Sequence, residues 1–506
     1  MKRAIKILIF LSLFFTGCST NEDPKPIDFT PIDLNAFSKN FRGFNLQGKF
    51  DVNWSNAGFT EQEFSMIHDL GFNFVRLPLD YLTYTDPNNW NNFVEAEVTE
   101  IDKAIEWGQQ YGVHVCLCLH RAPGYSVNTS AIPANQKLDL WTNETAQEAF
   151  VNHWGYFAER YKDISYNDLS FNLVNEPSNV DEETYVRVMK KAIDKIQSIN
   201  PNRVIYVDGL NYARDLIPSL KGTPDVIQAI HCYDPMTLTH YKASWVSGSD
   251  SWPVPTWPML NISQYLFGPY KSEYQSSLIL DGNFTKGTKV IINVGQVSVS
   301  STLEIKFDGS KIYTKPFICG PDLGSDWTEI VSTQWGYQNI SKKDYSVTLP
   351  SDGSQITVSN TQGDWMTFNK ITLSSDNGDL EIVPGNTTWG AKQDEYKITS
   401  EGKLTDKNDQ PLVMFGDLLN TIQEAKSEGI PLMVQEFGVH NQTPHDVTLA
   451  FLTDLVKVFR DNNLGYALWN FNGSFGILDS DRSDCSYDSY QGHQLDTQMM
   501  DIVKGN

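Results

Sequence analysis

A short unit recurs along this chain: a helical segment ends near a glycine, and a continuous apolar run follows at once. The unit is found at Gly71, Gly112, Gly429 and Gly465. Glycine just past a helix end accepts the left-handed backbone conformation that terminates many helices. The runs after these glycines do not alternate with polar residues, which is typical of parallel strands covered by helices. The unit therefore predicts an α/β fold of alternating helices and parallel strands.

Counting the apolar runs gives the number of strands. Eight are found, near residues 42–47, 72–77, 112–119, 168–175, 203–208, 226–232, 431–436 and 464–470. Eight βα units predict a closed (β/α)8 barrel, a TIM barrel. An open doubly wound sheet is the structural rival, but no glycine-rich phosphate loop follows the first strand. Thr60 and Glu63 form a capping box, and 183–200 and 447–462 have helical periodicity.

One interval is too long for a barrel loop. About 200 residues separate the sixth and seventh runs. Within this interval apolar and polar residues alternate, and turn signals occur at Asp281-Gly282 and Asp308-Gly309. The pattern predicts an antiparallel β-sandwich inserted into a barrel loop over roughly 270–385, with the barrel formed by 35–265 and 390–506.

The N-terminus has the composition of a targeting segment. Three cations, Lys2, Arg3 and Lys6, precede the apolar run 7–15, which has signal-peptide length and is too short to span a membrane. "FFTGC" resembles a bacterial lipoprotein cleavage box, in which Cys18 becomes the acylated first residue. We therefore expect a signal peptide over 1–18, a tether over 19–34, and a lipid anchor in the outer membrane. The sequence does not indicate which side of that membrane the protein faces. Simple secretion is the alternative.

Composition narrows the class of partner. The net charge is −23, so we expect no nucleic acid or anionic lipid surface as a partner. The 13 Trp and 22 Tyr suit a neutral, flat-faced ligand such as a sugar. No CxxC pair, metal constellation or cofactor motif is found, so we expect neither a metal nor a cofactor. We interpret the cysteines other than Cys18 as small buried hydrophobes, and we expect a monomer.

Barrel enzymes place their reacting groups at the C-terminal ends of the strands. Polar or aromatic residues stand at these ends in strands two, three, four, six, seven and eight: Arg76, His120, Asn175 with Glu176, His231 with Tyr233, Glu436 and Trp469. Each alone has an ordinary structural explanation, but their concentration at one end of a barrel predicts a site. Two glutamates suit glycosidic bond hydrolysis, because one protonates the leaving oxygen while the other attacks or activates water.

Several stretches together resemble glycoside hydrolase family 5: "RGFNLQG", "GFNFVRLP", "LHRAPGY", "FNLVNEP", "HCYDP", "VQEFG" and "ALWNFNGSFGILDSDR". The resemblance implies a retaining mechanism with Glu176 as acid/base and Glu436 as nucleophile. It also implies supporting roles, with Asn175 on the sugar 2-hydroxyl, Arg76 and Tyr233 on Glu436, His231 on Glu176, His120 lining the sugar site and Trp469 stacking beneath the sugar.

The resemblance also bears on the substrate. The loops "LHRAPGY" and "MTLTHYKASW" look most like those of endoglucanases, which favours β-1,4-glucan or mixed-linkage β-glucan. β-Mannan is the alternative, because glucose and mannose differ only at the 2-hydroxyl, and β-1,3-glucan is a further one within the family. An alternative of another class is a non-catalytic, glycan-binding surface lipoprotein. Loss of either glutamate would favour that class, and both are present.

The remaining tryptophans leave two questions open. Trp245, Trp252 and Trp257 form stacking subsites after strand six or simply hold a proline-rich loop. The insert loosely resembles galactose-binding-like sandwich modules, with Trp327, Trp335 and Trp365 as candidates for a sugar platform, although Trp365 in "GDWMTF" looks like a strand residue that faces the core. A structural role as a lid on the cleft is its alternative.

Overall fold

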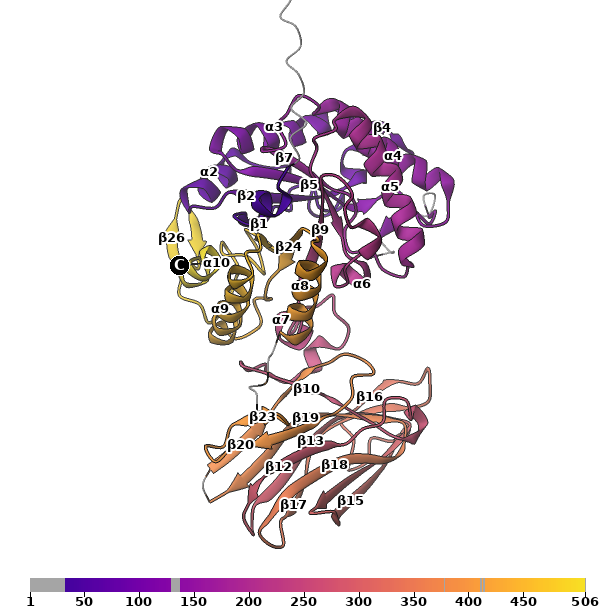
Figure 1. The fold of residues 1–506 in the computed structure, drawn as a ribbon, viewed down its shortest axis with the longest axis vertical. Coiled ribbons are helices and arrows are strands. Elements are labelled where there is room, and N and C mark those ends of the chain that lie inside the picture. Colours follow the sequence, from indigo (N-terminus) through magenta and orange to yellow (C-terminus); the bar gives the residue numbers. More distant parts are fainter. Residues whose placement is uncertain (1–31, 129–136, 377, 410–411, 413–414, 506) are drawn as a thin grey trace, which may run out of the picture.

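The computed structural model describes residues 32–128, 137–376, 378–409, 412 and 415–505. Cys18, the signal peptide and all of the tether but its last three residues lie outside this range. The structure has two bodies: a barrel built from both ends of the chain and a β-sandwich built from its middle (Figure 1). Among the described residues, no helix is both long and apolar enough to cross a membrane.

The first body is a closed parallel barrel. Its strands are β1 (Arg42–Asn45), β2 (Phe74–Asp80), β5 (His114–Ala122), β7 (Leu169–Asn172), β8 (Ile205–Asp208), β9 (Val226–Cys232), β24 (Leu432–Phe437) and β25 (Tyr466–Leu468). They are hydrogen-bonded in the order β2-β1-β25-β24-β9-β8-β7-β5, and β2 also pairs with β5, which closes the ring. All eight predicted strands are therefore present, and the predicted TIM barrel is confirmed.

Helices cover the outside of the barrel. They are α2 (Glu61–Asp69), α3 (Glu95–Tyr111), α4 (Glu144–Arg160), α5 (Glu182–Ile199), α8 (Gly416–Glu428), α9 (His445–Asp461) and α10 (Thr497–Lys504), with the short α1 (Leu34–Ser38), α6 (Leu210–Ala213) and α7 (Met236–Thr239). The capping box of Thr60 and Glu63 is present at the start of α2. Two small strand pairs lie in loops: β3 (Thr85–Asp86) with β4 (Asn89–Phe93), and β26 (Asp488–Tyr490) with β27 (His493–Leu495). The short β6 (Tyr125–Ser126) pairs antiparallel with the end of β5.

Three of the four helix-ending glycines behave as predicted. Gly71, Gly112 and Gly429 have φ of +86°, +66° and +66°. The prediction for Gly465 is wrong, because Asn463 takes the left-handed conformation after α9 instead. Gly465 serves a different purpose: a Cβ there would lie 2.1 Å from the carbonyl oxygen of Ser38, so only glycine permits this close approach.

Inside the barrel, an apolar layer and a polar layer lie at opposite ends of the strands. The apolar layer is formed by buried side chains from alternate strand positions: Phe74, Cys116, Val204, Tyr206, Ile227, Ala229, Met433 and Ala467. Further along β2 and β24 the buried residues become Arg76 and Glu436, both at most 3% exposed. A barrel filled at one end by apolar side chains leaves its C-terminal end free for chemistry.

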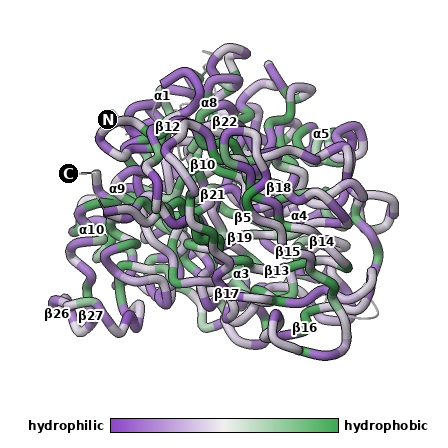
Figure 2. The backbone as a smooth tube through the Cα atoms, turned by 90° about the horizontal axis from the view of Figure 1, so that it is seen from below, coloured by the Kyte–Doolittle hydropathy of each residue, from purple (hydrophilic) through white to green (hydrophobic). Residues whose placement is uncertain are grey.

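The second body is a sandwich of two six-stranded sheets. One contains β11 (Tyr265–Phe267), β13 (Lys289–Ser298), β16 (Glu329–Ser332), β17 (Gln338–Thr348), β19 (Trp365–Ser375) and β20 (Gly378–Ile382). The other contains β12 (Leu278–Phe284), β14 (Ser300–Phe307), β15 (Ser310–Ile318), β18 (Gly353–Gly363), β22 (Glu395–Ile398) and β23 (Leu404–Asp406). Viewed from the sandwich end, hydrophobic residues gather toward the middle and hydrophilic ones toward the periphery (Figure 2).

The sheets reach beyond the predicted limits of 270–385. β22 pairs in parallel with β12, so residues 395–406 belong to the sandwich although the sequence analysis gave them to the barrel. On the N-terminal side, β11 pairs with β19 from residue 265 onward. Just before it, β10 (Leu260–Ser263) pairs with β21 (Pro384–Asn386), which brings the two flanks of the insert together. The strands β22 and β23 are short and polar, so they show little of the apolar–polar alternation that predicts the insert.

One glycine of the barrel wall gives a stability prediction. A Cβ on Gly43 would lie 1.7 Å from the carbonyl oxygen of Phe74 in the paired strand β2. We expect Gly43→Ala to lower the free energy of unfolding of the barrel by about 3 kcal/mol, because backbone atoms cannot move aside. The matched control is Gly222→Ala, where no atom lies within 4 Å and only the φ of +74° is unfavourable. Its cost should be about 1 kcal/mol. Urea unfolding measures both, and equal losses would contradict the explanation.

Candidate active site

Arg76 organises the polar layer at the C-terminal end of the barrel. It is fully buried on β2 and donates hydrogen bonds in three directions. Its Nη1 donates to Glu436 Oε1 at 2.5 Å, its Nη2 to Asn175 Oδ1 at 2.7 Å and its Nε to Asn172 Oδ1 at 2.9 Å. Asn45 Oδ1 accepts a further bond from Nη1 at 3.0 Å. The planar guanidinium thus holds side chains from strands one, four and seven in fixed positions.

Glu436 is buried because its side chain points from β24 into the polar layer. Its exposed fraction is 3%. Besides the bond from Arg76, its other oxygen accepts a hydrogen bond from Tyr233 Oη at 3.1 Å. His231 Nδ1 lies 3.6 Å from the same oxygen. Arg76 and Tyr233 therefore donate to this carboxylate, and His231 lies beside it.

Glu176 is held differently, on a strained backbone. It follows β7 and has φ of +48°, a left-handed conformation that costs a non-glycine residue about 1 kcal/mol or more. Two buried groups hold it there: its backbone N–H donates to Asp208 Oδ2 at 2.9 Å, and its carbonyl accepts from Tyr125 Oη at 2.6 Å. Its side chain remains 18% exposed, so this carboxyl faces open space while Glu436 does not.

His231 lies between the two glutamates. Its Nδ1 is 2.8 Å from Glu176 Oε1, and its Nε2 is 3.4 Å from Asp208 Oδ2. Burial alone would lower the pKa of His231, but the carboxylates of Glu436, Asp208 and Glu176 outweigh it and raise that pKa above its usual value. A protonated imidazole donates through both nitrogens, which suits its acceptors on either side.

The charges of the layer are interdependent. Burial opposes the charge of Arg76, yet the neighbouring carboxylates Glu436 and Asp208 raise its pKa, so the guanidinium stays cationic. Burial raises the pKa of the Glu436 carboxyl, while the charges of His231 and Arg76 pull it down. The ionised form of Glu436 therefore depends on these two cations.

The two glutamates lie close together. Oxygen atoms of Glu176 and Glu436 and a ring nitrogen of His231 are all within 4.8 Å of one another. Carboxyl groups about 5–5.5 Å apart allow one of them to attack a sugar directly, whereas a separation of about 6.5–9.5 Å leaves room for a water between. The nearest carboxylate oxygens of the pair are close enough for the first arrangement.

Aromatic rings form one wall beside the glutamates. Trp469, which follows β25, stacks on the His120 ring at 5.5 Å between centroids and 25° between planes. Phe50 packs against both rings at 4.6 and 5.4 Å. Trp54 lies 5.2 Å from Phe50 and is 67% exposed, which extends the wall outward. Burial, with help from the nearby cation Arg121, lowers the pKa of His120 well below its usual range, so this imidazole is neutral.

Buried nitrogens beside the glutamates include three that have no hydrogen-bond partner within the described part of the chain. They are Asn175 Nδ2, His120 Nδ1 and His231 Nε2, the last of which lies 3.4 Å from Asp208 Oδ2. An unpaired buried polar group is costly, and in native proteins such groups are usually satisfied by water or ligand. The nitrogens of Asn175 and His120 are suited to bonding the hydroxyl groups of a bound molecule. The structure thus brings all eight sequence-predicted site residues into one region, around Arg76, His231 and the aromatic wall.

The other tryptophans separate into exposed and structural ones. Trp245 is 60% exposed and contacts Phe475, whose ring also faces Tyr233 at 6.3 Å. Trp257 instead packs against Phe451 and donates to Asp454, so it holds its loop. In the sandwich, the core-facing position expected for Trp365 is confirmed, whereas Trp327 is wrong as a candidate for the platform. Trp327 and Trp365 are 8% exposed and pack inward, and only Trp335, at 74%, faces outward.

Sequence reasoning missed the residue that connects the two sides of the site. Asp208 ends β8, the fifth barrel strand, and is fully buried. It accepts from the Glu176 backbone and from Asn172 Nδ2 at 2.7 Å, and it lies 3.8 Å from Arg76. The signal was available, because "VIYVD" is an apolar run ending in a carboxylate, as in the two glutamate strands.

This position gives a prediction about catalytic efficiency. We expect Asp208→Asn to lower kcat on the order of 10–100-fold with little change in KM, because Glu176 and His231 lose the acceptor that fixes them. Asp208 is among the groups that raise the pKa of His231, so the variant imidazole should lose its proton at lower pH. The limb of the kcat profile that follows this proton should shift to lower pH.

The matched control is Tyr206→Phe on the same strand. Tyr206 is buried, and its hydroxyl has no hydrogen-bond partner among the described residues. Removing this hydroxyl should leave both kcat and the pH profile unchanged. A purely structural role for Asp208 would lower the amount of active protein and leave the profile where it was.

Comparisons with known proteins give the chain's relatives. A family model described as cellulase (glycosyl hydrolase family 5) matches residues 32–295. Endoglucanase C of Acetivibrio thermocellus is 30% identical over 189 residues, 37% of this chain and 53% of that protein. Cellodextrinase A of Ruminococcus flavefaciens is 30% identical over 192 residues, 37% of this chain and 54% of that protein. The chain spans about half the length of the curated relatives it matches.

Solved structures extend the likeness over the fold. A glycoside hydrolase of known structure matches with a TM-score of 0.58 at 22% identity, covering 92% of this chain and 98% of that one. Cel5A of Thermotoga maritima, solved with a mannotriose substrate, matches with a TM-score of 0.52 at 15% identity, covering 93% and 100%. At these identities the likeness establishes the fold.

Proposed function

The chain belongs to glycosyl hydrolase family 5, and we propose that it is a retaining β-glycanase that cleaves β-1,4-glucan or mixed-linkage β-glucan. The observation that carries this proposal is the glutamate pair. Two carboxyl groups lie within 4.8 Å of each other, one enclosed by Arg76 and Tyr233 and the other open toward the cleft beside His231.

In the first step, Glu176 gives its proton to the glycosidic oxygen while Glu436 attacks the anomeric carbon. The bond to the leaving sugar breaks, and a bond from Glu436 to the anomeric carbon forms. Arg76 and Tyr233 hold the attacking oxygens in place, and the charges of His231 and Arg76 favour the ionised carboxylate. In the second step, Glu176, now ionised, takes a proton from water, whose oxygen displaces Glu436. Two inversions at the same carbon give net retention.

The sugar at the cleavage site lies on Trp469. Its flat apolar face suits a pyranose ring, and the unpaired nitrogens of Asn175 and His120 are suited to its hydroxyls. Asn175, fixed by Arg76, donates to the 2-hydroxyl in this arrangement. Exposed Trp54 and Trp245 lie beyond Phe50 and Phe475, and such platforms on both sides of the glutamates support cleavage within a chain.

The glucan preference rests on the names of the relatives and on the loop resemblance. Endoglucanase and cellodextrinase are both names of glucan-cleaving proteins. β-Mannan and β-1,3-glucan remain alternatives, since related proteins include a glucan 1,3-β-glucosidase and the solved Cel5A holds mannotriose. The alternative of another class, a surface protein that only captures glycan, predicts binding without turnover.

A panel of purified polysaccharides tests the proposal. The wild type should release oligosaccharides from barley β-glucan and carboxymethylcellulose faster than from galactomannan or laminarin. Viscosity should fall before reducing ends accumulate, because internal cleavage shortens chains before it makes many ends. Glu436→Gln is the control for contaminating activity. Binding to these glycans with no product from any of them would support the glycan-capturing surface protein instead. Faster cleavage of galactomannan would identify β-mannan as the preferred substrate.

We also propose the cell location and a role for the insert. Cys18 carries the lipid anchor and places the enzyme in the outer membrane, supported by the cleavage-box resemblance of "FFTGC". Cys18→Ser should abolish incorporation of labelled palmitate, and unchanged labelling would contradict the anchor. In the sandwich, Trp335 is the remaining candidate for glycan contact. Retention of Trp335→Ala on a cellulose column, compared with wild type, tests that contact.

A further inference from the structure

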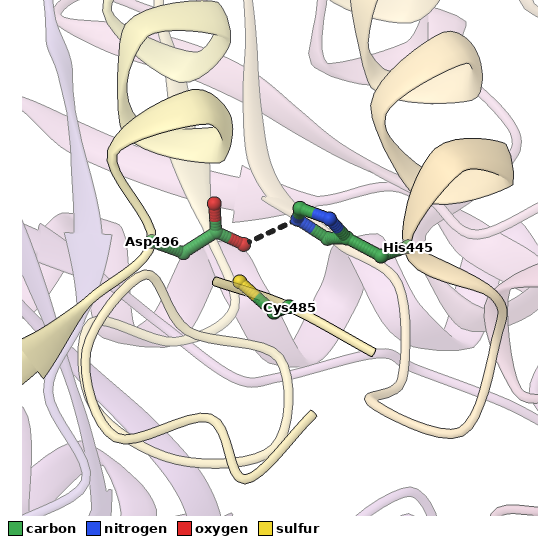
Figure 3. A group of neighbouring side chains, drawn as sticks. All are labelled: His445, Cys485 and Asp496. Carbon is green, nitrogen blue, oxygen red and sulfur yellow. Dashed lines mark hydrogen bonds and ion pairs between the residues drawn. The ribbon is translucent and has the colours of Figure 1, made fainter. Parts of the chain in front are cut away.

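Three side chains of different chemistry converge on one point away from the glutamates (Figure 3). His445 is the first residue of α9, Asp496 is the N-cap of α10, and Cys485 lies in the loop before β26. One nitrogen, one sulfur and one oxygen atom lie within 4.8 Å of one another. Asp496 is fully buried and His445 is 7% exposed, whereas Cys485 is half-buried and so leaves one side of the cluster open.

Ordinary contacts account for part of this cluster. His445 Nε2 lies 2.8 Å from Asp496 Oδ2, and Asp496 Oδ1 accepts from the backbone of Met499, which caps α10. The Cys485 thiol also has Asp496 as its hydrogen-bond partner. The interpretation of this cysteine as a small buried hydrophobe does not fit, because its sulfur faces a carboxylate and an imidazole at the edge of the core.

We propose that His445, Cys485 and Asp496 form a binding site for a divalent cation of the zinc type. Imidazole nitrogen, thiolate sulfur and carboxylate oxygen are the three ligand types that Zn²⁺ takes in proteins, and three protein ligands leave a fourth position for water. The fourth position lies on the open side next to Cys485. Hard cations such as Mg²⁺ and Ca²⁺ are disfavoured, because they take oxygen ligands.

The required rearrangement is small. Tetrahedral ligands at zinc distances lie about 3.3 Å apart, so the His445–Asp496 contact of 2.8 Å must widen by about half an ångström. The thiol must also lose its proton. A bound cation deprotonates a coordinating thiol. Binding therefore releases a proton.

The surrounding charges favour a cation. Asp484 adds a second carboxylate, which accepts from the His445 backbone at 2.8 Å. Arg482 is the opposing charge, but its guanidinium donates to the carbonyl oxygens of Thr443 and Val439 and to Thr448. These bonds hold the guanidinium of Arg482 against α9 and the loop that precedes it. With one thiolate and two carboxylates against one guanidinium, a divalent cation neutralises the cluster.

Such a cation connects segments that support the active site. α9 follows β24, which carries Glu436, and Cys485 lies on the segment that follows β25 and Trp469. Existing bonds already join the two: Asn441 Nδ2 donates to the Ser480 carbonyl at 2.7 Å, and Arg482 reaches Val439. The cation adds a further link and fixes both segments to α10 through Asp496. We assign it a structural role on this basis.

Cobalt(II) added alone to chelator-treated full-length protein tests the site. A thiolate bound to Co²⁺ gives an intense near-ultraviolet charge-transfer band, which oxygen and nitrogen ligands do not give. We expect this band to saturate near one equivalent and to disappear when Zn²⁺ displaces Co²⁺, since zinc binds more tightly. The glutamate pair with His231 is a second cluster of metal-binding residue types, but it has no sulfur, so the band separates the two clusters.

Cysteine variants identify the sulfur atom that binds the cation. Cys485→Ser should lose the band, and the matched control Cys232→Ser, a half-buried cysteine on β9, should keep it. Should Cys485→Ser fail to fold, X-ray absorption of the zinc-loaded wild type decides, with one sulfur at about 2.3 Å expected among lighter ligands. A wild type without the band, a band that survives Cys485→Ser, or a zinc shell without sulfur would each overturn the proposal.

Discussion

Glu436→Gln should lose turnover on every substrate, natural or activated, by at least about 10⁴-fold. The amide keeps the shape of the side chain, and its oxygen can still accept from Arg76, so the site stays assembled. What is lost is the ionised oxygen that attacks the anomeric carbon. No leaving group, however good, replaces that attack, which is why the loss should not depend on the aglycone. Initial rates on β-glucan and on a dinitrophenyl glycoside measure it.

A shorter variant makes the test stereochemical. Glu436→Ala leaves space into which azide can enter and attack the substrate from the side that the carboxylate occupied. One inversion then gives an α-glycosyl azide from a β-linked activated substrate. The exposed Glu424 on α8 supplies the control, because Glu424→Ala removes a carboxylate of the same type and should keep wild-type rates. Hydrolysis of an aryl glycoside by Glu436→Ala at the wild-type rate would show that the nucleophile is another residue.

These predictions rest on an environment that the sequence specified only in part. Apolar runs ending in polar residues were enough to predict eight strands and eight site residues, because one end of a barrel collects every strand terminus. The order of the hydrogen bonds was not predictable. That Arg76 reaches strands one, four and seven at once depends on the closure between β2 and β5, which no local pattern contains.

Asp208 is a site residue that its sequence pattern could have indicated. The run 203–208 ends in this carboxylate, as the runs of strands four and seven end in Glu176 and Glu436. The role of Asp208 also depends on the positive φ of Glu176, because only that turn aims the Glu176 backbone N–H at Oδ2. A left-handed glutamate is not predictable from residue type, since glycine and asparagine are the usual residues there.

The burial of Trp327 and the metal ligands were unpredictable for a different reason. Alternation places Trp365 on the core face of its strand, as found, but Trp327 stands outside any strand, so only the tertiary fold shows that it is buried. His445, Cys485 and Asp496 stand far apart in sequence, so no short ligand motif joins them. Both properties arise from tertiary contacts. Gly465 is similar, because its need for glycine comes from Ser38 in a distant segment.

Glu176→Ala should differ from both Glu436 variants in how its loss depends on the leaving group. A natural glycan leaves as a poor, strongly basic alkoxide and needs the proton of Glu176, so its cleavage should fall by about 10²–10⁴-fold. Dinitrophenolate leaves without a proton, and the first step on that substrate should stay nearly as fast as in wild type. The second step lacks the base that activates water, so the glycosyl-enzyme on Glu436 should accumulate as a burst followed by slow turnover.

Azide restores the second step, because this anion needs no base. It attacks the intermediate from the side that Glu176 faced, and the two inversions together give a β-glycosyl azide, the opposite anomer to that expected from Glu436→Ala. The pair of variants thus assigns both glutamates through one product analysis. Tyr125 and Asp208 hold the Glu176 backbone and not its carboxyl, so the alanine variant should keep the turn and its fold. Equal losses on natural and activated substrates, with no azide product, would mean that Glu176 only terminates the strand.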